Sequence, residues 1–116
     1  MDIGGILIGN DKPCYIIAEI GINHNGDIAL AKKLIDVAIN AGANAVKFQK
    51  RDLESIYQQK ILENPSLDSQ GTEILIDVLK NVEFDEDDFQ EIVNYSKGKK
   101  ITFLCTPWDI SSVDFL

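Results

Sequence analysis

The hydrophobic and polar positions of this chain repeat in the same order three times: a short apolar run, a polar loop and an amphipathic stretch. The apolar runs occupy residues 15–20, 45–49 and 101–106. The first run is apolar on both faces apart from Glu19, which is typical of a parallel strand that is covered on both sides. Because strands that alternate with helices imply right-handed crossovers, the pattern predicts an α/β fold with a parallel sheet.

The first amphipathic stretch predicts a helix over residues 28–41. Asp27 is a good N-cap for it, and Gly42 stands where the end of a helix favours a left-handed residue. The link after the second apolar run is long and polar, over residues 51–71. Links of that length are usually functional or disordered, although residues 53–62 could form a short helix.

The later amphipathic stretches predict three more helices. One over residues 72–80 is expected to bury Ile74, Leu75, Val78 and Leu79. Asp85 can cap the next, which runs to about Lys97 with Phe89, Ile92 and Val93 turned inward. The acidic run at 83–88 suits the positive end of that helix dipole, which explains it better than a metal site does. Ser111 or Ser112 is expected to begin the last helix.

Two architectures are compatible with this pattern, an open doubly wound sheet and a (β/α)₈ barrel. A barrel takes about 250 residues, so a chain of 116 residues would be less than half of one. The last predicted helix has barely begun where the chain stops, which would be an unusual domain boundary. The pattern alone does not separate the two folds.

The composition and charge of the chain indicate which kinds of partner it can bind. The chain has 45% hydrophobic and 26% charged residues, a net charge of −8 and an estimated pI of 4.4. An acidic protein is a poor nucleic-acid binder, although a local group of lysines can still hold a small anion. Cys14 and Cys105 lie in apolar runs, so we expect buried thiols and a cytoplasmic protein. The N-terminus does not resemble a signal peptide, and no apolar run approaches the roughly 20 residues that span a bilayer.

Polar residues recur at the carboxyl ends of the apolar runs, where parallel α/β folds build their sites. They are Glu19, Lys47, Gln49 and Thr106. Because side chains alternate along a strand, Lys47 and Gln49 share a face, which would be the interior of a barrel. Charges placed there need a partner or a ligand. A structural Glu19–Lys47 ion pair and a ligand site are equally compatible with the spacing.

The loop at residues 21–26 contains glycines and leads into a helix N-terminus, so its backbone N–H groups could hold an anion. It matches neither a dinucleotide fingerprint nor a P-loop. His24 is the only histidine of the chain. One histidine cannot make a metal site, and in a polar loop it is more often a hydrogen-bonding residue than a ligand. Trp108 is expected to pack rather than to stack on a ligand.

Three blocks of sequence carry a resemblance to a known family. AEIGINHNGD at residues 18–27, AGANAVKFQKR at 41–51 and CTPWD at 105–109 resemble the first three strand ends of the sialic acid synthases. That family makes N-acetylneuraminate, legionaminate and pseudaminate. The resemblance implies that residues 1–116 are the N-terminal portion of a TIM (β/α)₈ barrel, its first three βα units. A small antifreeze-like domain would follow the complete barrel.

The resemblance also implies a reaction. Carbon 3 of phosphoenolpyruvate attacks the aldehyde of an N-acetylated amino sugar, such as N-acetylmannosamine, water adds at carbon 2, and phosphate leaves. A divalent metal, Mn²⁺ or Mg²⁺, activates the aldehyde, and its histidine ligands lie on later strands than this chain contains. The full-length protein is expected to be a homodimer that binds neither nucleic acid nor membrane. The present chain is expected to be a fragment that is inactive on its own.

Site residues follow from the same resemblance. Lys47 and Thr106 correspond to contacts of phosphoenolpyruvate, and Gln49 to a glutamine near the sugar. Glu19 is a candidate for acid–base catalysis, while Asn23 and His24 belong to the same signature as further substrate-binding residues. The alternative is a stand-alone, non-catalytic α/β module that binds a small anion or a protein partner. Sequential strand order favours the synthase, and an order with the first strand in the middle favours the module.

Overall fold

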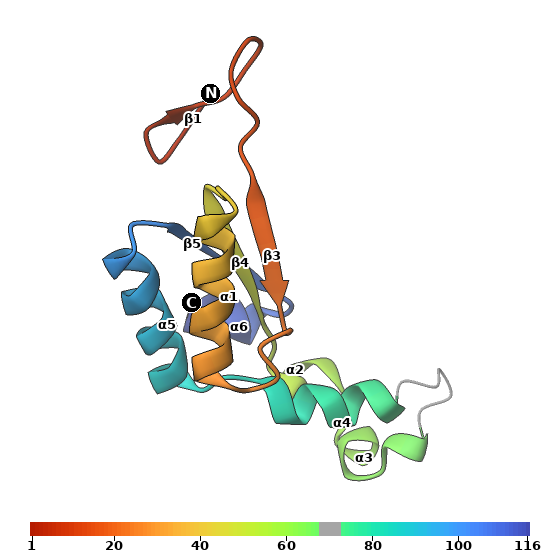
Figure 1. The fold of residues 1–116 in the computed structure, drawn as a ribbon. Coiled ribbons are helices and arrows are strands. Elements are labelled where there is room, and N and C mark those ends of the chain that lie inside the picture. Colours follow the sequence, from red (N-terminus) through yellow and green to blue (C-terminus); the bar gives the residue numbers. More distant parts are fainter. Residues whose placement is uncertain (68–72) are drawn as a thin grey trace.

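The computed structural model describes residues 1–67 and 73–116, and its centre is a parallel sheet (Figure 1). The strands are β3 (Ile17–Gly21), β4 (Ala45–Lys50) and β5 (Thr102–Pro107), in the order β3-β4-β5. Both neighbouring pairs are parallel. The sequence prediction of parallel strands in sequential order is therefore confirmed, and this order counts against the alternative module.

Six α-helices and one 3₁₀ turn connect and flank these strands in the part of the chain that the structure describes. They are α1 (Ile28–Asn40), α2 (Leu53–Ile56), α3 (Gln59–Glu63), η1 (Pro65–Leu67), α4 (Glu73–Val82), α5 (Glu86–Gly98) and α6 (Ile110–Phe115). The Asp27 side chain accepts hydrogen bonds from the N–H groups of Ala29 and Leu30, and Asp85 accepts one from Asp88. Gly42 follows α1 with a φ of 83°. The predicted caps of α1 and α5 are thus confirmed.

The buried face of α4 differs from the prediction. Leu79 is buried as predicted, but Leu75 and Val78 are 47% and 43% exposed, and the helix instead buries Ile76 and Val82. The apolar residues of this short helix cover a wide arc, so the sequence is compatible with more than one buried face. Packing against the rest of the fold determines which of these faces is buried. The start at Thr72 and the side chain of Ile74 lie outside the described residues.

The start of α6 also differs from the prediction. Asp109 is its N-cap, and the carboxylate accepts hydrogen bonds from the N–H and the hydroxyl of Ser112. The expected starts at Ser111 and Ser112 are therefore wrong. A carboxylate close to a helix N-terminus is a charged acceptor, so it makes a stronger cap than a serine hydroxyl.

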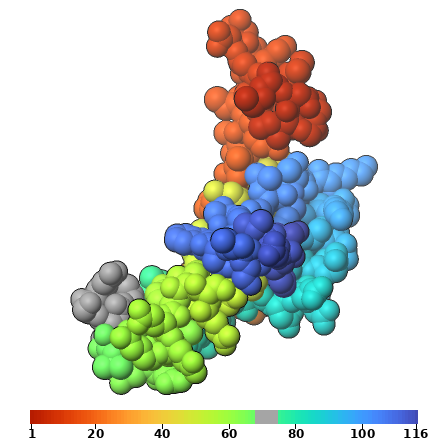
Figure 2. Space-filling view, turned by 180° about the vertical axis from the view of Figure 1, so that it is seen from behind, coloured from red at the N-terminus to blue at the C-terminus, as the bar shows by residue number. Residues whose placement is uncertain are grey.

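An N-terminal hairpin was not predicted. It consists of β1 (Asp2–Ile3) and β2 (Ile6–Leu7), which pair in antiparallel fashion through a turn at Gly4 and Gly5. The hairpin projects from the end of the sheet where the strands begin, while α2 and α3 lie at the opposite end (Figures 1 and 2). Strands of two residues are too short to show an alternating pattern in the sequence.

The hydrophobic core lies between one face of the sheet and the helices α1 and α5. It includes Ile20, Ala31, Ile35, Val46, Phe48, Phe84, Phe89 and Ile92. Side chains alternate along a strand, so the neighbouring residues of β3, β4 and β5 lie on the opposite face. No helix covers that opposite face within residues 1–67 and 73–116. Helices on one face of a sequentially ordered parallel sheet are the arrangement of a (β/α)₈ barrel wall, whose uncovered face is the interior.

The cysteines only partly follow the prediction. Both are free thiols, and Cys105 is half-buried, but Cys14 is exposed. The prediction of a buried Cys14 is wrong because the residue precedes β3 in the segment between the hairpin and the sheet, outside the core. No helix among the described residues is long and apolar enough to cross a membrane.

Candidate functional site

The uncovered face of the sheet carries the first two predicted site residues in contact. Glu19 and Lys47 are direct register partners on β3 and β4. The Lys47 ammonium lies 2.7 Å from Oε2 of Glu19, and the two side chains are 35% and 46% exposed, respectively. The ion pair that the sequence left open is therefore formed. Because both groups remain accessible from the uncovered face, the pair and a ligand site are compatible.

Gln49 and Thr106 lie two residues further along the same face. They are register partners on β4 and β5. Gly21, at the end of β3, has a φ of 57°, and a Cβ atom at this position would lie 3.3 Å from Nε2 of Gln49 and 3.5 Å from Oε1 of Glu19. The Gln49 amide and the Glu19 carboxylate therefore lie close against Gly21, where a larger side chain would be crowded and the left-handed backbone favours glycine. The structure thus brings Glu19, Lys47, Gln49 and Thr106 to the same face near the carboxyl ends of adjacent strands.

His24 lies away from this face. It is 2% exposed, and its ring stacks on Phe84 at a centroid distance of 4.0 Å. Its Nδ1 accepts a hydrogen bond of 3.2 Å from the N–H of Gly26. Burial lowers the pKa of His24, although a hydrogen bond with the Gly21 backbone acts in the opposite direction. The buried ring therefore holds the loop together, and the expectation that His24 contacts substrate stays a prediction.

Asn23 is exposed in the same loop. Its Nδ2 donates to the carbonyl of Ile20 at 2.8 Å, and its own N–H donates to the same carbonyl at 3.0 Å. The amide side chain therefore closes the turn after β3. Its remaining amide oxygen is free to meet a ligand, so Asn23 stays a candidate at the rim of the site.

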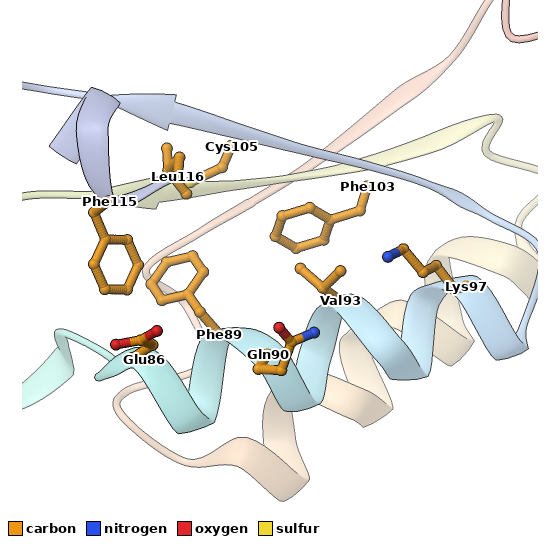
Figure 3. Close-up of a pocket in the computed structure, with 9 residues that line it drawn as sticks. All are labelled: Glu86, Phe89, Gln90, Val93, Lys97, Phe103, Cys105, Phe115 and Leu116. Carbon is orange, nitrogen blue, oxygen red and sulfur yellow. The ribbon is translucent and has the colours of Figure 1, made fainter.

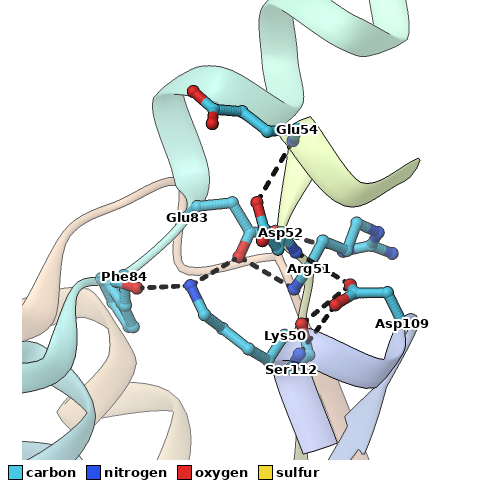
Figure 4. Close-up of polar contacts among 8 residues, drawn as sticks. All are labelled: Lys50, Arg51, Asp52, Glu54, Glu83, Phe84, Asp109 and Ser112. Carbon is cyan, nitrogen blue, oxygen red and sulfur yellow. Dashed lines mark hydrogen bonds and ion pairs between the residues drawn. The ribbon is translucent and has the colours of Figure 1, made fainter. Parts of the chain in front are cut away.

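A second polar cluster at the end of β4 was not predicted from the sequence. Glu83 lies between two cations: Oε2 is 3.5 Å from Nζ of Lys50, and Oε1 is 3.6 Å from Nη1 of Arg51 (Figure 4). All three side chains are less than 15% exposed. Lys50 also donates to the carbonyl of Phe84 at 3.0 Å. Buried charges of this kind are stable only when paired, so the cluster anchors the α4–α5 connection to the strand.

Arg51 links this cluster to the candidate site. Its Nη2 donates a hydrogen bond to Oε1 of Gln49. Its Cζ lies 4.3 Å from the centre of the Trp108 ring, a cation–π contact, and Trp108 itself is 57% exposed. The expectation that Trp108 packs is met only in part, because the ring contacts Arg51 but is more than half exposed.

Asp109 connects the segment that follows β4 with the first turn of α6. Its Oδ2 accepts from the N–H of Asp52 at 2.9 Å and from the hydroxyl of Ser112 at 2.8 Å (Figure 4). Burial raises the pKa of Asp109, but these hydrogen bonds outweigh it and hold the pKa below its usual value. An ionised Asp109 therefore keeps the segment after β5 against the segment after β4.

The divalent metal implied by the resemblance does not fit the residues present here. The part of the chain that the structure describes contains no group of three or more His, Cys, Asp or Glu residues able to hold a metal ion. Asp85 caps α5, and Glu86, Asp87 and Asp88 lie in its first turn, as predicted. The prediction is wrong for Glu83, whose carboxylate is buried between Lys50 and Arg51.

A hollow of about 420 Å³, lined by both apolar and polar side chains, lies on the helix side of β5 (Figure 3). Phe89, Phe103, Cys105 and Phe115 point into it. Phe103 and Cys105 pack against the core, so the hollow is on the opposite face of β5 from Thr106. It is therefore separate from the candidate site.

Known proteins are similar to this chain in sequence and in fold. The chain is 40% identical over 114 residues to N-acetylneuraminate-9-phosphate synthase of Mus musculus, covering 97% of this chain and 32% of that protein. It is 38% identical over 107 residues to N,N'-diacetyllegionaminic acid synthase of Campylobacter jejuni, covering 90% of this chain and 32% of that protein.

A crystal structure of N-acetylneuraminic acid (sialic acid) synthetase from Leptospira borgpetersenii, in complex with citrate, superposes with a TM-score of 0.79 at 34% identity. The match covers all of this chain and 36% of that one. The chain thus spans about a third of the length of these relatives. The model of the NeuB family matches residues 34–116. On sequence and fold together, the chain belongs to the NeuB family.

Proposed function

We propose that this chain forms part of the active site of a synthase that condenses phosphoenolpyruvate with an N-acetylated amino sugar, giving a sialic acid-type sugar acid and phosphate. The observation that carries the proposal is the common face shared by Glu19, Lys47, Gln49 and Thr106 at the carboxyl ends of three adjacent parallel strands. The named activities of the relatives support it, because the two synthases make sugar acids of this class.

Lys47 is the anion-binding group in this proposal. Its ammonium has three N–H donors, and the contact with Glu19 at 2.7 Å uses one of them. The other donors can bind the phosphate or the carboxylate of phosphoenolpyruvate while the ion pair fixes the direction of the side chain. Thr106, on the neighbouring strand, adds a hydroxyl that can donate a directed hydrogen bond to the same anion.

Glu19 is the proton-transfer group. In the reaction, the C3 atom of phosphoenolpyruvate bonds to the aldehyde carbon, the aldehyde oxygen gains a proton, and water adds at C2 before phosphate leaves. The attacking water must lose a proton, and a carboxylate within reach of it can accept that proton. The Glu19 side chain is 46% exposed on the uncovered face, so a water or a substrate bound at that face can reach its carboxylate.

The divalent metal implied by the resemblance is assigned to none of the residues of this chain. When bound, a divalent ion would polarise the aldehyde oxygen as a Lewis acid. Since the described residues offer no cluster of ligands for such an ion, the proposal assigns it to none of them.

The test is the steady-state kinetics of the full-length protein that carries this chain. Phosphate release is followed with phosphoenolpyruvate, Mn²⁺, and either N-acetylmannosamine or its 6-phosphate. Lys47→Ala is expected to lower kcat/KM for phosphoenolpyruvate by about ten- to a hundredfold, the loss of one charge-assisted hydrogen bond.

Lys33→Ala is the matched control, because Lys33 is an exposed lysine on α1 in the helix layer. It is expected to leave kcat/KM unchanged. A wild-type protein that releases no phosphate with either sugar, or equal losses in the two variants, would contradict the proposal.

A further inference from the structure

The side-chain amide of Gln49 can face the site in two ways. It carries one acceptor oxygen and one NH₂ donor group, which exchange places on a half-turn of the amide. Whichever group faces the ligand decides whether the ligand must offer an acceptor or a donor. In this structure the oxygen is engaged, because Nη2 of Arg51 donates to Oε1 of Gln49.

Arg51 allows only one of these orientations. A guanidinium group has N–H donors and no acceptor, so the reversed amide would set donor against donor. Nε2 of Gln49 is consequently turned toward Gly21, where an added Cβ would lie 3.3 Å from it and 3.5 Å from Oε1 of Glu19. The site therefore presents an N–H donor next to a carboxylate.

The guanidinium itself is held before any ligand binds. Arg51 is 8% exposed. Its Nη1 forms an ion pair with Oε1 of Glu83 at 3.6 Å, and its Cζ lies 4.3 Å from the centre of the Trp108 ring. With a carboxylate and an indole ring in contact with it, the Arg51 guanidinium has little freedom to turn. It therefore fixes the orientation of the Gln49 amide before a ligand binds.

We propose that Arg51 is a positioning residue that fixes the Gln49 amide with its NH₂ group toward the sugar. The site then selects a sugar with an acceptor oxygen at that point, a hydroxyl or the carbonyl of an acetamido group. A sugar without such an oxygen leaves a desolvated donor unpaired and is disfavoured. This inference rests on the proposed function, in which Gln49 lies near the sugar.

The first experiment measures the KM of each substrate separately in the full-length protein. Arg51→Met is expected to raise the KM for the amino sugar by about tenfold and to leave the KM for phosphoenolpyruvate within about twofold of wild type. Lys50→Met is the matched control, because it removes the other cation of Glu83 without touching Gln49. It is expected to leave both KM values unchanged.

A double-mutant cycle separates positioning from stability. In a Gln49→Leu background, where there is no amide to orient, Arg51→Met is expected to have no further effect on the KM for the sugar. Trp108→Leu, at an exposed position, removes the ring that contacts Arg51. As a single variant it should raise the KM for the sugar, and in the Gln49→Leu background it should have no further effect. This pair of variants tests the positioning role if Arg51→Met does not fold.

Equal changes in the two KM values, or effects that simply add in the double variants, would overturn the positioning role while the proposed function stands. A wild-type protein that releases no phosphate with either sugar would overturn the proposed function and this inference with it.

Discussion

The ammonium of Lys47 lies 2.7 Å from the carboxylate of Glu19, across the β3–β4 pair, with both side chains more than a third exposed. Ion pairs that water can reach contribute at most about 1 kcal/mol to stability. We therefore expect Lys47→Ala to lower the free energy of unfolding of residues 1–116 by no more than about 1 kcal/mol in urea titrations. A loss of several kcal/mol would show instead that the pair is a structural element of the sheet.

Gly26 is in close contact with the carbonyl of Asn81. Its φ is 73°, and an added Cβ would come within 2.4 Å of that oxygen. Gly26→Ala is expected to lower the free energy of unfolding by at least about 2 kcal/mol, since a left-handed alanine and a backbone clash both oppose it. The urea midpoint measures the change.

Gly98→Ala is the control for that substitution. Gly98 ends α5, does not have a positive φ, and has open space around an added Cβ. Alanine there should be neutral or stabilise the protein by up to about 1 kcal/mol. Equal effects at the two glycines would contradict the close approach of the loop to α4.

Protonation of His24 should weaken the fold. Because burial places its pKa in the folded state below the ordinary value of 6.5, the unfolded chain binds more protons as the pH falls. The contribution of His24 is therefore complete above about pH 6.5 and is lost as the pH falls toward the folded pKa. Urea midpoints between pH 7.5 and 5.5 should decrease over this range.

His24→Phe serves as the comparison, because phenylalanine keeps an aromatic ring against Phe84 but has no titrating nitrogen. Its urea midpoint should vary less over the same pH range. A slope as steep as that of wild type would assign the pH dependence to other groups.

The two thiols should react at different rates. Burial, with a further effect from the charge of Glu83, raises the pKa of Cys105 to about 12, and only the thiolate is nucleophilic. Cys14 is exposed. Brief alkylation at pH 8 followed by peptide mass spectrometry should find the label on Cys14, and Cys14→Ser should abolish the fast phase. Rapid labelling of Cys105 would mean that β5 opens readily.

Residues 1–116 on their own are expected to show no synthase activity. Their uncovered sheet face leaves Lys47 and Glu19 in water, which weakens each electrostatic contact with a ligand. The outer edges of β3 and β5 have no strand partner among the described residues, so we also expect self-association. Phosphate release and light scattering at increasing concentration measure the two effects. Turnover above the no-protein control would show that the chemistry needs less of the barrel.

Local sequence was sufficient for the parts of the fold that depend on neighbouring residues. The strand runs, the N-caps Asp27 and Asp85 and the left-handed Gly42 were all predicted, because each reflects the preference of a residue for its own backbone conformation. Alternation along β4 also placed Lys47 and Gln49 on one face. The resemblance then supplied the barrel and its strand order.

Tertiary structure decided which side chains meet. The buried face of α4, the exposure of Cys14 and the placement of His24 against Phe84 depend on elements far apart in the chain. The contacts of Arg51 with Glu83 and Trp108 could not be predicted from local sequence either, since both residues are more than 30 positions away in the chain. A cation that is buried needs a partner of opposite charge, but only the packing of the strands and helices determines which residues those partners are.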